Sequence, residues 1–222
     1  MKRIGFLGDI HAEDARLAIA LRELSRQSVD IIVAVGDIVD GPGDVEKTVA
    51  LLREYDVSSV RGNHERWFFA NQMRDLPDAH ALASVSLETR EWLSSLPLMF
   101  ELPTSAGKLL VCHGLGADDM ASILPGDDVA LIRYDKGFRA LCRTSSAKFV
   151  LNGHSHKRMV RHVEDRIFIN AGTLFRDHEP SFGLVDFAAG YVTTWLFAPD
   201  LSIRSIPPIP LDEPPPSTRR EG

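Results

Sequence analysis

The chain has 222 residues, of which 44% are hydrophobic and 25% charged, and its formal net charge is −6. This length is enough for one substantial core and not for two full domains. The acidic balance argues against partners bound through bulk positive charge, namely long nucleic acid and an anionic membrane surface. No apolar stretch approaches the roughly twenty residues of a membrane span, and the N-terminal apolar run is too short for a signal peptide, so we expect a cytoplasmic location.

Strands alternate with helices through the N-terminal part of the chain. Apolar runs predict strands over residues 3–7, 31–35, 58–60 and 109–112, and apolar residues at helical spacing predict helices over 14–27, 45–54, 87–95 and 129–141. This alternation favours an α/β fold. From about residue 147 the pattern changes to consecutive strands with short turns, over residues 148–151, 166–169, 183–187 and 192–197.

The end of the chain differs in composition from the rest. Six prolines fall between residues 205 and 222, at Pro207, Pro208, Pro210, Pro214, Pro215 and Pro216. Proline cannot donate a hydrogen bond within a sheet, and the segment has little apolar surface to bury. We therefore expect one domain over residues 1–204 and a flexible tail over residues 205–222.

A residue able to bind a metal follows each of five predicted strands, beside a glycine. The ligands of open α/β sheets bind beyond the carboxyl ends of the strands. Glycine there lets the backbone turn sharply and approach a ligand closely. The five segments are Gly8-Asp9-Ile10-His11, Gly36-Asp37-Ile38-Val39-Asp40, Arg61-Gly62-Asn63-His64-Glu65, His113-Gly114 and Asn152-Gly153-His154-Ser155-His156.

Each segment alone has an ordinary structural interpretation. Gly-Asp and Gly-Asn are common turns, and a single buried histidine is more often part of a core than a ligand. The joint occurrence is what indicates a metal site, because five of the eight histidines fall within these segments. The other three, His80, His162 and His178, receive no predicted function.

The residue types fit a hydrolytic divalent-metal site. Imidazole nitrogen suits zinc and iron, carboxylate oxygen suits manganese, and no cysteine pair suggests a thiolate site. One aspartate can bridge two ions because its two oxygens diverge. Two ions about 3.5–4 Å apart can clamp both sides of a phosphoryl displacement and lower the pKa of a bound water to near 7.

These five segments, in this order, resemble the motifs of the calcineurin-like metallophosphoesterases. The resemblance runs from Asp9 to His156 and implies a four-layer sandwich of two packed β-sheets flanked by helices. It implies two divalent ions, with Mn²⁺, Fe and Zn²⁺ as candidates. The implied ligands are Asp9, His11 and His156 for the first ion, Asn63, His113 and His154 for the second, and Asp37 as the bridge.

The resemblance also implies two catalytic residues that are not ligands. His64 would protonate the leaving group, and Asp40 would orient His64. Arg-Gly-Asn-His-Glu is typical of the phosphoprotein-phosphatase and diadenosine-tetraphosphatase branch. That branch places a phosphate-binding arginine after the second motif, where this chain has Gly41. Arg61, Arg66 and Arg158 are candidate replacements, and the alternative is that each is an ordinary surface arginine.

The sequence therefore predicts a phosphoesterase that hydrolyses phosphate mono- or diesters by attack of a hydroxide held on two metal ions. The same centre would serve a nuclease or nucleotide phosphodiesterase. A protein that keeps the fold as a scaffold and has lost catalysis is a third interpretation, and loss of ligands or of His64 would be its expected mark. The natural substrate, the physiological metal and the oligomeric state do not follow from the sequence.

Overall fold

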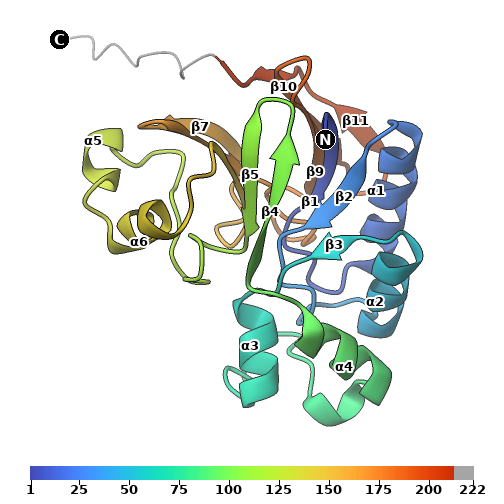
Figure 1. Ribbon diagram of the computed structural model, residues 1–222. Helices are drawn as coiled ribbons and strands as arrows, with labels where there is room; N and C mark the ends of the chain where they lie inside the picture. The colour runs from blue at the N-terminus through green and yellow to red at the C-terminus, as the bar shows by residue number, and fades with distance from the viewer. Residues whose placement is uncertain (213–222) are drawn as a thin grey trace, which may run out of the picture.

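Two β-sheets pack face to face with helices on both outer sides, as Figure 1 shows for this computed structural model, which describes residues 1–212. The first sheet has the order β11-β10-β9-β1-β2-β3, with β12 also paired to β10. Its strands are β1 (Arg3–Leu7), β2 (Ile31–Ala34), β3 (Ser58–Ser59), β9 (Ser181–Asp186), β10 (Tyr191–Phe197), β11 (Ile203–Ser205) and β12 (Ile209–Pro210). The second sheet has the order β4-β5-β6-β8-β7. Its strands are β4 (Met99–Thr104), β5 (Gly107–Cys112), β6 (Phe149–Asn152), β7 (Met159–Val163) and β8 (Arg166–Asn170).

The alternation of side chains along the strands explains the layers. Ile4 and Phe6 of β1 belong to the core between the sheets, together with Leu109 and Val111 of β5. Their neighbours along each strand point to the opposite face, because successive residues of a strand alternate. On that outer face Leu110 packs with residues of helix α6 (Lys136–Thr144). Each sheet thus buries both faces, which is why its central strands are apolar throughout.

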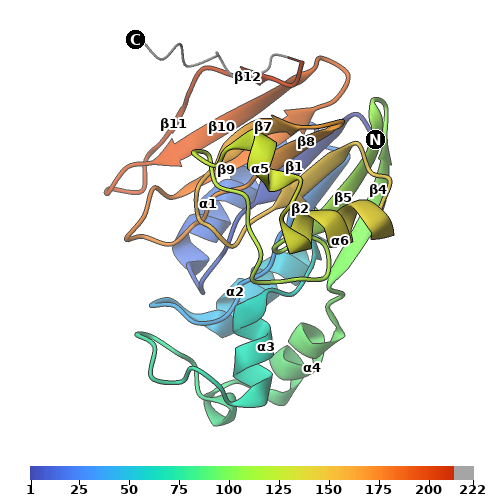
Figure 2. The ribbon, with the colours of Figure 1, turned by 90° about the vertical axis from the view of Figure 1, so that its left-hand side faces the viewer.

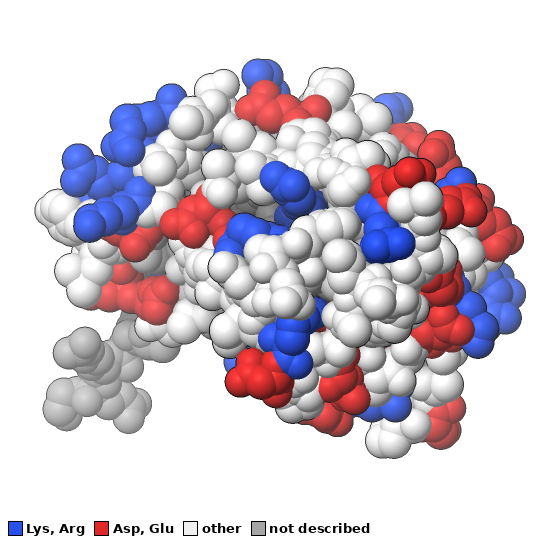
Figure 3. Space-filling model, turned by 90° about the horizontal axis from the view of Figure 1, so that it is seen from below, with Lys and Arg blue, Asp and Glu red and all other residues white. Residues whose placement is uncertain are grey.

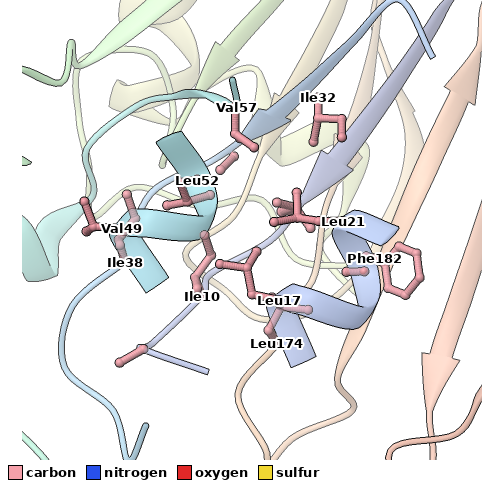
Figure 4. Close-up of a cluster of buried hydrophobic side chains, with 14 of the residues drawn as sticks. Ile10, Leu17, Leu21, Ile32, Ile38, Val49, Leu52, Val57, Leu174 and Phe182 are labelled. Carbon is pink, nitrogen blue, oxygen red and sulfur yellow. The ribbon is translucent and has the colours of Figure 1, made fainter. Parts of the chain in front are cut away.

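The helices cover the outer faces. Helices α1 (Asp14–Arg26) and α2 (Val45–Glu54) pack on the first sheet, and α5 (Val129–Ile132) and α6 (Lys136–Thr144) on the second. Figure 4 shows the first of these interfaces, where Leu17, Leu21, Val49 and Leu52 meet Ile32 of the sheet. Helices α3 (Asn63–Ala70) and α4 (Leu87–Ser95) and the short 3₁₀ helix η1 (Leu82–Ser84) lie below the sheets in Figures 1 and 2. The predicted four-layer α/β sandwich is confirmed.

Most predicted elements are present within one or two residues, and one differs in kind. Residues 129–141 form two helices instead of one, because Asp135 has an extended backbone with ψ of 139° and cannot continue a helix. Its carboxylate instead accepts a hydrogen bond from the backbone N–H of Phe138 and begins α6. Helix α3 and strands β4, β7, β11 and β12 were not predicted.

The sheet extends beyond the predicted end of the domain at residue 204. Ile209 and Pro210 pair with Val192 and Tyr191 of β10, and Leu211 is buried in the core between the sheets. Proline is tolerated here because β12 is short and lies at an edge. Part of the predicted tail therefore packs on the domain, and residues 213–222 lie outside the described residues. Within residues 1–212, no helix is long and apolar enough to cross a membrane.

Candidate metal centre

The carboxyl ends of β1, β2, β5 and β6 deliver the predicted ligands to one edge of the two sheets. Asp9 follows β1, Asp37 follows β2, and His113 follows β5. His154 and His156 follow β6. Asn63 is the first residue of α3, which lies at the lower end of the sheets in Figure 1.

The side chains of these residues form two groups that share Asp37. In the first, ligand atoms of Asp9, His11, Asp37 and His156 all lie within 4.8 Å of one another. In the second, the same holds for Asp37, His113 and His154. Asn63 joins the second group, because its Oδ1 lies 2.9 Å from His113 Nε2 and 2.9 Å from His154 Nδ1. All seven residues predicted as ligands are thus brought together.

Two of the histidines hold Nδ1 in a hydrogen bond and direct Nε2 to the centre. Nδ1 of His11 lies 2.7 Å from the carbonyl oxygen of Asp40, and Nδ1 of His113 lies 2.7 Å from that of Val35. A carbonyl oxygen only accepts, so each Nδ1–H donates. In the neutral ring Nε2 then carries the lone pair, as metal-bound histidines in proteins typically do.

Asp9 is a buried carboxylate with one oxygen unused. Its Oδ1 accepts a hydrogen bond from the backbone N–H of His154 at 3.1 Å. Its Oδ2 is buried without a hydrogen-bond partner, although His156 Nε2 lies 2.9 Å away in a geometry unsuited to one. A Cβ at Gly153 would stand 2.0 Å from Asp9 Oδ1, so only glycine fits there. An uncompensated buried carboxylate oxygen among imidazole nitrogens fits a divalent cation.

Five of the nine predicted site residues have a left-handed backbone. The φ angles are 47° at His11, 47° at Asp37, 62° at Asp40, 64° at His154 and 56° at His156. This conformation is uncommon for residues other than glycine and costs on the order of 1–3 kcal/mol each. Such strain concentrates at functional sites, where the surrounding structure holds it in place.

Charge is concentrated on the pair of Asp37 and His113, whose Oδ2 and Nε2 atoms lie 3.3 Å apart. Burial disfavours the charged form of His113, but the attraction of Asp37 outweighs it and raises the pKa of His113 to about 10. Burial likewise opposes ionisation of Asp37, and the nearby His113 more than offsets it, so the pKa of Asp37 is lowered. By contrast, burial lowers the pKa of His11 and of His154.

His64 lies at the edge of the centre and forms a chain of contacts with Asp40 and Arg74. His64 Nδ1 lies 2.9 Å from Asp40 Oδ2, and its Nε2 is 4.0 Å from Asp37 Oδ2. Burial works against charge on His64, but the hydrogen bond to Asp40 and the charge of Asp37 raise its pKa. The buried Asp40 also accepts two hydrogen bonds from Arg74, at 2.8 and 2.9 Å. Against the effect of burial, these partners lower the pKa of Asp40 to about 2.

Three residues at the site were not predicted from the sequence. Arg74 and His80 both contact Asp40, with the backbone N–H of Asp40 donating to His80 Nδ1 at 3.0 Å. His178 Nδ1 lies 2.6 Å from Nδ1 of His156. Arg74 and His80 come from the irregular segment between α3 and η1, and His178 from the loop before β9. Neither a motif nor a regular spacing in the sequence indicates that these three residues contact the site.

Packing explains why residue 41 is a glycine and not the phosphate-binding arginine. A Cβ at Gly41 would stand 1.8 Å from the carbonyl oxygen of His11, so no side chain fits there. Of the candidate replacements, Arg66 binds Asp119 through two hydrogen bonds of 2.7 and 2.9 Å, and Arg158 binds Glu179 at 3.1 Å. Arg61 has its Nε buried without a hydrogen-bond partner.

Comparison with known proteins finds two relatives by sequence. The chain is similar to the uncharacterized protein MJ0912 of Methanocaldococcus jannaschii, with 22% identity over 190 residues, which are 81% of this chain and 72% of that protein. It is also similar to serine/threonine-protein phosphatase 1 of Salmonella typhimurium, with 39% identity over 66 residues. That match covers 29% of this chain and 31% of the phosphatase.

The fold matches a solved structure over nearly its whole length. The crystal structure of hypothetical protein PH1004 from Pyrococcus horikoshii aligns with a TM-score of 0.68 and 17% identity, covering 93% of this chain and 87% of that one. The family model that matches residues 1–190 describes the calcineurin-like phosphoesterase superfamily domain. With most of its length matched, the chain belongs to the calcineurin-like phosphoesterase superfamily.

Proposed function

We propose that this protein is a metal-dependent phosphoesterase that hydrolyses phosphate mono- or diesters at a centre of two divalent ions. The observation that carries the proposal is the pair of ligand groups that share Asp37. The donor atoms are nitrogen and oxygen without sulfur, which suits Mn²⁺, Fe or Zn²⁺. Asp9, His11 and His156 would hold one ion, Asn63, His113 and His154 the other, and Asp37 both.

Each group of residues would contribute a separate part of the chemistry. When bound, two such ions supply an activated water at neutral pH and positive charge for the phosphate oxygens. His64 would protonate the leaving oxygen from Nε2, since its Nδ1 is hydrogen-bonded to Asp40. Asp40 would hold the ring in that orientation and favour its protonated form, as the raised pKa of His64 indicates.

Three alternative functions would use the same residues. A nuclease acting on long nucleic acid is disfavoured by the net charge of −6 and by the interspersed acidic and basic side chains on the side of α3 and α4 (Figure 3). A nucleotide phosphodiesterase is compatible with the centre. A phosphoprotein phosphatase, as the Salmonella relative is named, is disfavoured by Gly41, whose surroundings exclude the arginine of that branch.

Metal analysis combined with ester hydrolysis tests the proposal. We expect up to two divalent ions per chain, hydrolysis of p-nitrophenyl phosphate or its bis-ester, loss of activity with a chelator, and recovery with manganese or another transition metal. Asp37→Asn should lower occupancy of both sites, whereas His162→Ala, outside the centre, should change neither occupancy nor rate. Full activity of metal-free protein would refute the mechanism. A chain that binds two ions and cleaves no phosphate ester would support the scaffold interpretation instead.

A further inference from the structure

A pocket of 390 Å³ opens beside the candidate centre, and its outer wall is apolar. Trp67 of α3, Met73, Leu76 and Pro77 of the following segment, and Phe175 of the loop after β8 line this wall. The volume lies within the range of small-molecule sites, roughly 300–1,000 Å³. A pocket of this size accommodates one compact group better than an extended polymer.

The inner wall of the pocket is the candidate centre itself. His11, Asp40, His64 and His156 line it. The ring of Trp67 stands edge-on to that of His64, with centroids 4.9 Å apart, and the ring of Phe175 stands edge-on to that of His11 at 5.4 Å. The pocket therefore adjoins the residue assigned to protonate the leaving oxygen, which makes it the place for the leaving group.

Beyond the proton of His64 and the ions of the centre, which would serve the phosphate and its leaving oxygen, the described lining offers no positive charge to a ligand. Among the described residues, its lining includes no lysine or arginine. The arginines around it are already engaged by carboxylates, Arg74 by Asp40 at 2.8 Å and Arg176 by Glu13 at 2.8 Å. A negatively charged leaving group, such as a second phosphate, would lose water there without gaining a partner.

We propose that this pocket binds the leaving group of the substrate and that this group is an uncharged, flat aromatic ring system. The inference rests on the proposed phosphoesterase function and narrows its substrate class. Edge-on and offset contacts with Trp67 and Phe175 favour a flat ring, and the apolar wall favours one without charge. A nucleoside and a simple aryl alcohol share this chemistry.

A binding measurement tests the pocket without relying on turnover. Methylphosphonate and 2-naphthylmethylphosphonate present the same non-hydrolysable phosphonate, with and without an aromatic group. Calorimetry on the metal-loaded protein should give a Kd at least about tenfold lower for the naphthyl compound, because burial of that much apolar surface contributes more than 1.4 kcal/mol. Competition by free thymidine and by free 2-naphthol distinguishes a nucleoside from an aryl alcohol. The compound that competes more tightly identifies the class of the leaving group.

Two matched methionine variants test whether the difference in Kd between the phosphonates arises in the pocket. Met73→Asp puts a charge on the pocket wall at a residue that is 47% exposed and has φ of 52°, a conformation that aspartate tolerates. It should remove most of the tenfold difference between the phosphonates. Met120→Asp, at a methionine that is 46% exposed and outside the pocket lining, should preserve the difference. Trp67→Ala should weaken only the naphthyl compound, and Phe69→Ala on the same helix should weaken neither.

The charge requirement is tested with two esters of nearly equal shape. The leaving groups 4-hydroxybenzamide and 4-hydroxybenzoate differ by an amide in place of a carboxylate. We expect kcat/KM to favour the amide by about tenfold, mainly through KM. Equal Kd values for the two phosphonates, or an unchanged Met73→Asp variant, would overturn the inference while ester hydrolysis persists. Absence of both phosphonate binding and hydrolysis would instead overturn the proposed function and the inference together.

Discussion

The carboxylate of Glu65 holds the loop that carries Asp37. The backbone N–H of Asp37 donates to Glu65 Oε2 at 3.0 Å, and those of Ile38 and Val39 donate to Oε1 at 2.7 and 3.0 Å. The N–H of Gly62 donates to Oε2 at 2.7 Å, so the same side chain joins the second and third motifs. The left-handed backbone of Asp37 is thus stabilised by a residue that is not itself a candidate ligand.

This contact predicts that Glu65→Gln will lose both stability and metal. A neutral amide accepts more weakly than a carboxylate, and its NH₂ group would face backbone N–H donors. Loss of charge-assisted hydrogen bonds with one donor left unsatisfied should cost about 1–3 kcal/mol of unfolding free energy. Urea unfolding and metal analysis measure the two effects. Glu88→Gln, at a surface residue, serves as the control, and equal behaviour of the two variants would contradict the assigned role of Glu65.

A second prediction concerns Gly41. Gly41→Arg would match the phosphoprotein-phosphatase motif, yet its Cβ would meet the carbonyl oxygen of His11 at 1.8 Å. We expect the variant to be destabilised by about 1–3 kcal/mol through overpacking and to bind less metal, because His11 would be displaced. Gly126→Ala is the matched control, since nothing lies within 4 Å of its Cβ. A gain of phosphatase activity in Gly41→Arg would show that the loop adapts.

The sequence predicts the central strands well because burial on both faces gives them continuous apolar runs. Strands β4 and β7 lack that pattern. Strand β4 contains Pro103 and alternates half-buried with exposed residues, and β7 contains Arg161 and His162 between apolar residues. Their place in the sheet is decided by pairing with β5 and β8, which is a tertiary interaction.

The candidate centre could likewise be predicted from a local pattern in the sequence. Its residues directly follow strands, so a local pattern indicates their position in space. Arg74 lies 34 residues from Asp40 and His178 lies 22 residues from His156 along the chain. Both come from irregular segments, where no periodicity relates a residue to the site. Contacts of this kind depend on how the loops fold over the edge of the sheets.

A third prediction links metal binding to proton release. Without metal, His113 should carry a proton at pH 7, because Asp37 raises its pKa to about 10 despite burial. Burial lowers the pKa of His11 and His154, so these are neutral and add no proton. A metal must displace the proton of His113, so binding at pH 7 should release about one proton from this residue, and affinity should rise with pH between 6 and about 10. Calorimetry in buffers of different ionisation enthalpy counts the proton, and a pH-independent affinity would contradict this.

A fourth prediction separates chemistry from metal binding at His64. His64→Ala should keep the metals and the fold, and its rate should fall by about 10²–10⁴-fold. A nitrophenolate leaves without a proton, so its ester should be affected least, and an alkyl ester most. His113→Ala should lose metal and fail on both esters alike. Metal content and the rates on both esters, measured for the two variants, distinguish a general acid from a metal ligand. A His64→Ala protein that lost metal, or slowed both esters equally, would not be missing a general acid.

The last prediction assigns Arg74 a positioning role that acts through Asp40. Arg74 holds both carboxylate oxygens of Asp40, at 2.9 and 2.8 Å, while Asp40 holds His64 at 2.9 Å. Arg74→Ala should therefore keep the metals and lower kcat by about tenfold, less than the loss of His64 itself. Arg74→Lys should recover part of the rate, since an ammonium retains the charge and not the paired geometry.

The double variant His64→Ala/Arg74→Ala discriminates this role from a general loss of stability. If Arg74 acts only through His64, its removal should cost nothing further once His64 is absent, and the two effects should be strongly non-additive. Arg53→Ala, which breaks a surface pair with Glu88, is the control and should leave the rate unchanged in either background. Additive losses in the double variant would mean that Arg74 serves the reaction independently of His64, by contacting the substrate or by supporting the fold.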